Sequence, residues 1–125
     1  MSGYKDLVIF QMAYKLAIRV HRFSMKLPDF EKYELGSQVR RSSMSVKDTI
    51  VEGYGRRKYK AEYIKYLTYA HASCDEATSQ LETIVELYPE FQEIKELLKL
   101  YYDLGRKLNT YISYVEENWI GKKKL

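Results

Sequence analysis

The chain has 125 residues, of which 46% are hydrophobic and 30% are charged, and its formal net charge is +4. This length and apolar content suffice for a single domain, spanning 1–125, with its own core. Two prolines and six glycines are too few for the frequent turns of a β-sandwich or barrel, and a single cysteine excludes an internal disulfide. The composition therefore predicts an all-α fold.

Apolar residues that recur at intervals of three and four predict four helices. The first covers residues 6–27 and ends at Pro28, because proline cannot continue the helical hydrogen-bond ladder. The second covers residues 31–53 and ends at the glycine pair Gly53 and Gly55, where the chain turns.

The third predicted helix is the longest and covers residues 59–88, before Pro89. The fourth covers residues 90–119 and precedes a basic tail, 121–125. Its main apolar ladder consists of Ile94, Leu98, Tyr101, Gly105, Leu108, Ile112, Val115 and Trp119. Four helices joined by short connections predict an antiparallel up-down four-helix bundle.

Charged residues interrupt the apolar run of the N-terminal stretch "MSGYKDLVIFQMAYK". A signal peptide needs a continuous apolar core, and a transmembrane helix needs about 20 apolar residues. We therefore expect a cytoplasmic protein with no membrane partner.

Two of the predicted helices carry a second apolar stripe beside the first. Its members repeat every seven residues and are Ile9, Leu16, Phe23, Leu97, Leu104 and Tyr111. Either the core is broad, or these faces are buried against other subunits. The second alternative is favoured because large exposed apolar patches are rare on monomers, so a homo-oligomer is expected.

Charge is distributed unevenly along the chain. Residues 1–60 contain 13 Lys+Arg against 6 Asp+Glu, whereas residues 61–120 contain 5 against 11. Such a separation produces a basic face for phosphate, or it allows the acidic half of one chain to meet the basic half of another. Both alternatives remain open at this stage.

The stretch "VEGYGRRKYKAEY", residues 51–63, is the strongest candidate for phosphate contact. No Ser, Thr, Asp or Asn lies between Ile50 and Leu67 to cap the third helix, and cations oppose the dipole at a helix N-terminus. A bound phosphate would satisfy both the free N–H groups and the cations, while the tyrosines stack on bases. The alternative is a solvated basic loop.

The basic residues and tyrosines of this stretch are joined by cations elsewhere in the chain as candidate nucleic-acid contacts. The full set is Arg40, Lys47, Tyr54, Arg56, Arg57, Lys58, Tyr59, Lys60, Lys122, Lys123 and Lys124.

A polar stripe follows one face of the second predicted helix. Its members are Gln38, Arg41, Ser45, Asp48 and Glu52. The spacing of three and four predicts a hydrogen-bond network with neighbouring helices, and a ligand-binding face is the alternative.

Enzyme chemistry finds little support, and we expect neither a bound metal nor a cofactor. Di-iron bundles require glutamate three residues before a histidine, and neither histidine has one. His71, Cys74 and Asp75 do lie within one helical turn, so a metal half-site is conceivable. A buried Cys74 in the core is the favoured interpretation.

Three segments resemble the four-helix-bundle proteins of the 23S rRNA intervening-sequence family. They are "LVIFQMA" at 7–13, "YELGSQVRRSSMSVKDTIVEGYGRR" at 33–57 and "YIKYLTYAHASCDEATSQLE" at 63–82. The family positions Q-x-x-R-x-x-x-S and N-I-x-E-G are matched by Gln38, Arg41, Ser45, Ile50, Glu52 and Gly53, with Thr49 where Asn is common.

The resemblance implies a non-enzymatic bacterial protein encoded within large-subunit ribosomal RNA genes or elsewhere in the genome. It further implies a ring-shaped homo-oligomer, typically a pentamer. Similar bundles, the accessory variability determinants, accompany reverse transcriptases of diversity-generating retroelements as nucleic-acid-binding partners. The expected partners are therefore further copies of the chain, RNA or DNA, and a reverse transcriptase or other protein. The alternative is a protein-interaction scaffold with no nucleic-acid role.

Overall fold

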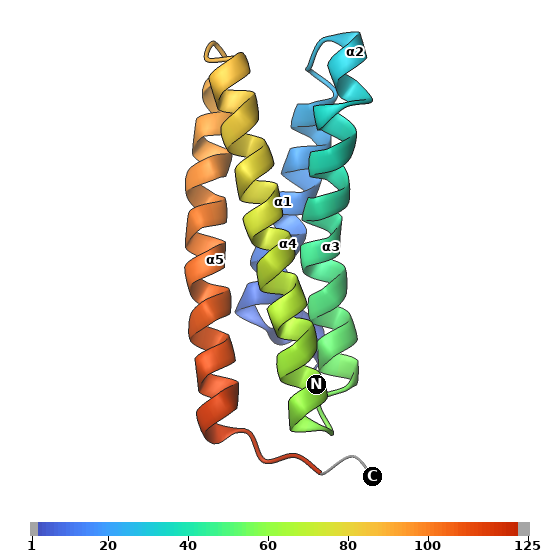
Figure 1. Ribbon diagram of the computed structural model, residues 1–125, viewed down its shortest axis with the longest axis vertical. Coiled ribbons are helices and arrows are strands. Elements are labelled where there is room, and N and C mark those ends of the chain that lie inside the picture. The colour runs from blue at the N-terminus through green and yellow to red at the C-terminus, as the bar shows by residue number, and fades with distance from the viewer. Residues whose placement is uncertain (1–2, 123–125) are drawn as a thin grey trace.

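The computed structural model describes residues 3–122, and over this range the only secondary structure is helical (Figure 1). Its elements are η1 (Tyr4–Asp6), α1 (Val8–Ser24), α2 (Asp29–Lys32), α3 (Leu35–Gly55), α4 (Lys60–Leu87) and α5 (Gln92–Asn118). The predicted all-α fold with four long helices is confirmed. None of the described helices is long and apolar enough to cross a membrane.

The second predicted helix, 31–53, differs from the structure at both ends. At its start the chain forms the short α2, and α3 begins only at Leu35, whose N–H donates to the Glu31 carboxylate at 3.3 Å. At its end the helix continues through both glycines, neither of which has a positive φ. Gly53 instead allows close packing, because a Cβ there would lie 3.1 Å from the Cβ of Tyr66 on α4.

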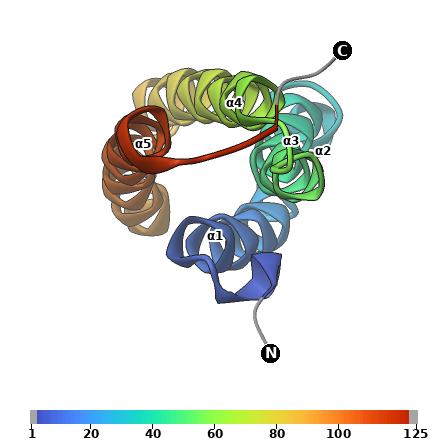
Figure 2. The same ribbon diagram turned by 90° about the horizontal axis from the view of Figure 1, so that it is seen from below.

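The four long helices surround one core in the cyclic order α1, α3, α4, α5 (Figure 2). The connections from α1 to α3 and from α4 to α5 lie at one end of the bundle, together with α2 (Figure 1). We call this the α2 end. The connection from α3 to α4, residues 56–59, lies at the opposite end, the loop end, next to the segment that follows α5.

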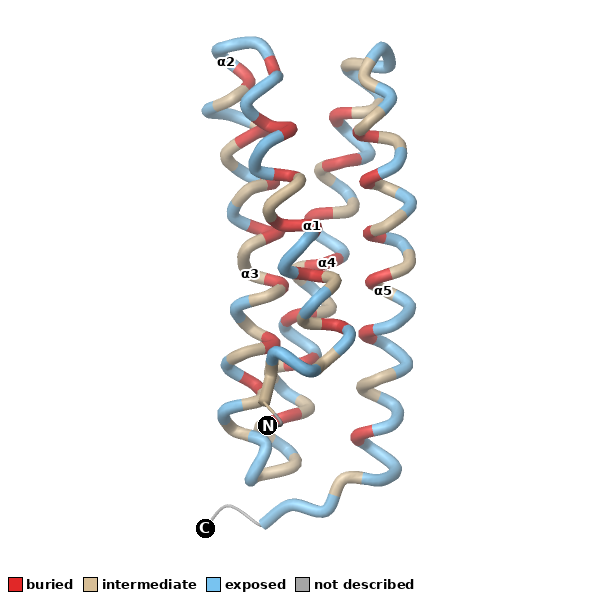
Figure 3. Tube along the Cα trace, turned by 180° about the vertical axis from the view of Figure 1, so that it is seen from behind, coloured by how far each residue is buried: buried red, intermediate tan, exposed pale blue. Residues whose placement is uncertain are grey.

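Buried residues occupy the inner face of every long helix (Figure 3). This core includes five of the six residues predicted to form a subunit interface. Ile9, Leu16, Phe23, Leu97 and Leu104 are all 4% exposed or less. Tyr111 is half-buried, and its hydroxyl bonds that of Tyr63 at 2.8 Å. The broad-core alternative is therefore the correct one for this stripe, because these side chains already pack within one chain.

Candidate nucleic-acid interface

Arg40 joins three elements at the α2 end. Its guanidinium donates to the hydroxyl of Ser24 on α1 and to the carbonyl of Lys32 on α2, each at 2.8 Å. Ser24 is fully buried, and a Cβ at Gly36 would lie 3.1 Å from the guanidinium. Arg40 was predicted to contact phosphate, but these bonds commit its side chain to holding the connection between α1 and α3.

Glu31 completes this packed end. It is only 6% exposed and accepts hydrogen bonds from the Leu35 N–H and, at 2.7 Å, from the Tyr88 hydroxyl. The bond to the carboxylate raises the pKa of Tyr88. Through Tyr88, the connection between α4 and α5 is fixed to the start of α3.

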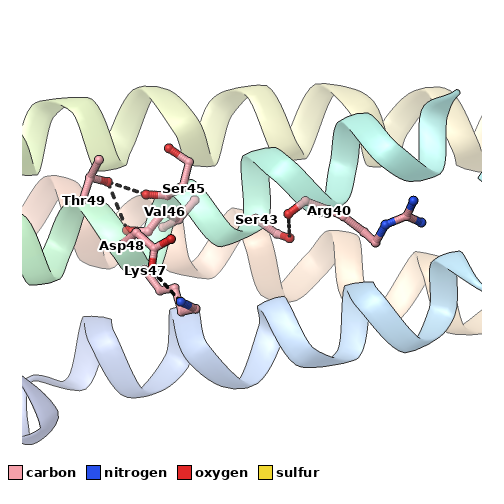
Figure 4. Close-up of polar contacts among 7 residues, drawn as sticks. All are labelled: Arg40, Ser43, Ser45, Val46, Lys47, Asp48 and Thr49. Atoms are coloured by element: carbon pink, nitrogen blue, oxygen red, sulfur yellow. Dashed lines mark hydrogen bonds and ion pairs between the residues drawn. The ribbon is translucent and has the colours of Figure 1, made fainter. Parts of the chain in front are cut away.

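The predicted polar stripe does not form one network. Arg41 and Asp48 bond residues of their own helix, Ser37 and Lys47 respectively, and Lys47 lies 2.5 Å from Asp48 (Figure 4). Ser45 does reach another helix and bonds the Ser73 hydroxyl of α4 at 2.8 Å.

At the remaining stripe positions, the contacts with α4 are made by residues that the sequence pattern did not indicate. Gln38 is exposed, and its neighbour Ser42 makes the contact instead, donating to the side chain of Gln80 on α4 at 2.6 Å. Glu52 reaches α4 indirectly, through Arg56.

Arg56 connects α3 and α4 at the loop end. It lies 3.0 Å from the Glu52 carboxylate and 3.1 Å from that of Glu62, and its guanidinium carbon is 4.7 Å from the centre of the Tyr66 ring. The hydrogen bond to Glu52 raises the pKa of Arg56. Two carboxylates already accompany this cation, so Arg56 is less available for a phosphate than a cation without an ion pair.

The segment 119–122, which we call the C-terminal segment, crosses the connection between α3 and α4. The Trp119 indole N–H donates to the carbonyl of Arg57 at 2.8 Å, and the Lys122 N–H donates to that of Lys58 at 2.7 Å. Gly121 makes the approach possible, because a Cβ there would lie 2.6 Å from the Lys60 nitrogen. The sequence pattern placed Trp119 in a helical ladder and did not reveal this role.

Lys60, a predicted phosphate contact, is also committed to the fold. Its ammonium donates at 2.7 Å to the carbonyl of Glu116, in the last turn of α5. A cation at a helix C-terminus is favourable, because the carbonyls there lack intrahelical partners.

An aromatic cluster surrounds Tyr63 and includes Trp119 of the C-terminal segment. The ring of Trp119 packs edge-on against Tyr63 with centroids 5.1 Å apart, and Tyr54 packs against the same ring at 6.3 Å. Burial, followed by the hydrogen bond to Tyr111, raises the pKa of Tyr63. The tyrosine is therefore neutral at physiological pH and acts as a packing residue.

Of the candidate cations within residues 3–122, three are exposed at the loop end: Arg57, Lys58 and Lys122, which we call the basic surface. Within residues 3–122, no ion pair includes any of them. The Arg57 guanidinium lies 3.9 Å above the Tyr54 ring and donates to the Tyr54 carbonyl.

Tyr59, the residue before α4, provides no side-chain cap, as the sequence predicted. Lys123 and Lys124 lie outside the described residues.

The conceivable metal half-site on α4 does not assemble. Cys74 is buried, and its thiol lies 3.6 Å from the carbonyl of Tyr101. Burial raises the pKa of Cys74 to about 12. His71 instead lies 3.6 Å from Asp75, and no group of three potential ligands occurs among residues 3–122.

Comparison with known proteins supports the fold and identifies the family. A crystal structure from Bacteroides thetaiotaomicron VPI-5482, of a protein of unknown function from the S23 ribosomal protein family, superimposes with a TM-score of 0.75 at 20% identity. The match covers 84% of this chain and 98% of that chain. No curated protein matches the sequence. Residues 5–110 match the family of the 23S rRNA-intervening sequence protein, and the chain therefore belongs to that family.

Proposed function

We propose that this up-down four-helix bundle is a non-enzymatic protein that binds RNA or DNA through the basic surface at its loop end. The observation that carries the proposal is the exposure of Arg57, Lys58 and Lys122 without a carboxylate partner in the described chain. Phosphate contacts supply most of the affinity in sequence-independent binding, and exposed lysine and arginine side chains make them.

The geometry favours binding because the backbone beneath these cations is already held. Trp119 bonds the Arg57 carbonyl and Lys122 bonds the Lys58 carbonyl, so ordering this part of the loop adds little cost on association. The Arg57 guanidinium also rests on the Tyr54 ring, which limits its rotamers while leaving the side chain exposed.

The test is a double substitution, Arg57→Gln with Lys58→Gln, measured by fluorescence anisotropy on a structured RNA at several salt concentrations. Removing two phosphate contacts should weaken binding and reduce the slope of log K against log salt by about 1.5 units. The matched control is Arg106→Gln with Lys107→Gln, an exposed Arg-Lys pair on α5 that lies beside Asp103. Equal affinity and slope for the two double variants would contradict the proposal.

We further propose that the protein works as a homo-oligomer, a ring of five copies. Helices α1 and α3 carry 6 Lys+Arg and 2 Asp+Glu, whereas α4 and α5 carry 6 and 10, so the two sides of the bundle have opposite charge. Sides of opposite charge can pair between copies. Sedimentation equilibrium checks this, and a mass near the 14.9 kDa of one chain would contradict it.

The same separation of charge supports a second candidate function, a protein-interaction scaffold with no nucleic-acid role. Two ion pairs reach α5, Arg19 of α1 with Glu96 and Lys26 of the connection after α1 with Glu93, and they use only a few of the charges within the chain. A scaffold would form salt-sensitive assemblies and show no retention on immobilised RNA at any ionic strength.

A further inference from the structure

A groove of about 660 Å³ lies between η1, α1 and α3, apart from the residues of the basic surface. Its aromatic lining is a row of three rings: Tyr4 packs edge-on against Phe10 at 4.9 Å, and Phe10 stacks on Tyr14 at 5.8 Å. Tyr14 ends the row and is 48% exposed. The groove therefore offers an aromatic ring to solvent, supported from below by a second ring.

Charged groups surround these rings. Lys5 and Lys15 are exposed and contribute to the lining from η1 and α1. Asp48 and Lys47 contribute from α3, and Figure 4 shows Lys47 extending toward α1. Lys47 lies beside Asp48 at 2.5 Å, so the carboxylate keeps a countercharge when the groove is filled.

We propose that this groove binds one unpaired base of a single-stranded nucleic acid, an inference that rests on the proposed nucleic-acid function. The base stacks on Tyr14, as bases do on exposed aromatic side chains in single-strand-binding proteins. Lys5 and Lys15 lie where flanking phosphates need cations. Asp48 accepts a hydrogen bond from an exocyclic amino group of the base.

The carboxylate gives the groove a preference among bases. Cytosine and adenine present an exocyclic amino donor, whereas uracil presents a carbonyl acceptor at the same edge. Asp48 can pair with the first two and repels the third. Cytosine and adenine should therefore bind more tightly than uracil.

The groove and the basic surface share one helix, so a single ligand can reach both. Asp48 and Gly55 are both on α3, and seven residues of helix span about 10 Å. Glu52 lines the groove and pairs with Arg56, the first residue after α3. A duplex end or hairpin at the basic surface could therefore extend an unpaired tail into the groove.

The test measures binding of fluorescein-labelled octamers of cytidylate and uridylate by anisotropy at low salt. Tyr14→Ala should weaken binding of the cytidylate octamer about tenfold, and Tyr14→Phe should bind like the wild type. The matched control is Tyr69→Ala, because Tyr69 on α4 is 47% exposed and packs 5.4 Å from Tyr66. Asp48→Asn should reduce the preference for cytidylate over uridylate. Equal loss in the Tyr14→Ala and Tyr69→Ala variants, or no loss in either, overturns the inference.

A second probe, a blunt duplex with no unpaired base, separates this inference from the proposed function. The Arg57→Gln, Lys58→Gln variant should lose affinity for the duplex, whereas Tyr14→Ala should keep it. If only the double substitution has an effect, on either probe, the groove is rejected and the basic surface stands. If only Tyr14→Ala has an effect, on the octamers, the groove stands and the basic surface is rejected. A wild-type protein that binds neither probe rejects both.

Discussion

At the α2 end, Arg40 donates hydrogen bonds to Ser24 and to the Lys32 carbonyl, inside a packed connection. At the loop end, Arg57 donates to the Tyr54 carbonyl in the last turn of α3 and rests on the Tyr54 ring, and its side chain stays exposed. Both arginines were equally good candidates for phosphate contact from the sequence. Their difference shows that a cation is available for a ligand when its side chain stays exposed, as that of Arg57 does despite a local hydrogen bond, and not when its hydrogen bonds hold it between packed elements.

The two ends also differ in what holds their connections. Side chains hold the α2 end: Arg40 and Glu31 bridge elements from buried or half-buried positions. The loop end is held largely through its backbone, because Trp119 and the Lys122 N–H bond main-chain carbonyls. The side chains of residues 57 and 58 therefore remain free of structural roles between helices. Four substitutions examine this comparison.

The largest effect is expected from Arg40→Ala. The change leaves the buried Ser24 hydroxyl and the Lys32 carbonyl without a charged donor, so the free energy of unfolding should fall by about 2–4 kcal/mol. Arg57→Ala should change it by less than about 0.5 kcal/mol, as exposed substitutions usually do. Urea denaturation followed by circular dichroism measures both values, with exposed Arg41→Ala as the control on the same helix. Similar losses for Arg40→Ala and Arg57→Ala would remove the distinction between the ends.

The next effect is expected from Trp119→Ala, which should lower the free energy of unfolding by about 1–3 kcal/mol. The change removes both the ring contact with Tyr63 and the bond to the Arg57 carbonyl. Trp119→Phe keeps the ring and should recover part of the loss. Because this is the only tryptophan, circular dichroism rather than tryptophan fluorescence is the appropriate probe. A neutral Trp119→Ala would mean that the C-terminal segment does not hold the loop.

The middle of the bundle provides a reference that belongs to neither end. The Tyr101 hydroxyl is buried beside Ser43 and has no hydrogen-bond partner among the described residues, since Ser43 donates to the Arg40 carbonyl. Burial raises the pKa of Tyr101 above its usual value. The folded state then keeps a proton that the unfolded state releases, so this contribution to stability is complete below about pH 10 and is lost as pH rises further.

Tyr101→Phe should therefore change stability at pH 7 by less than about 1 kcal/mol. Above about pH 10 the unfolding free energy of the variant should fall with pH less steeply than that of the wild type, by about 1.4 kcal/mol per pH unit. Urea titrations at pH 7, 10 and 11 measure this, and an unchanged slope would contradict the argument. Tyr114→Phe is a suitable control, because Tyr114 is an exposed tyrosine on the same helix.

The smallest effect is expected from Lys60→Met. The substitution removes an exposed bond to the Glu116 carbonyl and should cost about 0.5 kcal/mol. Because its ammonium is bound to the end of α5, we also expect little change in RNA affinity. A loss of affinity as large as that of Lys58→Gln would place Lys60 in the basic surface.

Periodicity predicted the number of helices well, because apolar spacing directly reflects which face is buried. It predicted the burial of α5 less well: Leu97 and Leu104 are fully buried, whereas Leu98 of the main ladder is partly exposed. Two adjacent apolar stripes on one helix leave its rotation undetermined until the neighbouring helices are placed. The predicted interface at Leu97 and Leu104 was wrong for this reason.

The candidate site was predictable in location but not in composition. A basic, uncapped turn before α4 is visible in the sequence and is present in the structure. Which cations are free depends on partners far along the chain: Arg40 bonds Ser24, 16 residues away, and the Trp119 indole bonds a carbonyl 62 residues away. No local pattern encodes such pairings.

The two sides of the bundle carry opposite charge, so each chain has an electric dipole perpendicular to the long axis of the bundle. Helices α1 and α3 form its positive side. A polyanion exerts a torque on such a dipole before any contact forms. An arriving strand would therefore meet the side that carries the groove of Tyr14 more often than chance allows. Added salt would then slow association more than it speeds dissociation, because screening removes the orientation first.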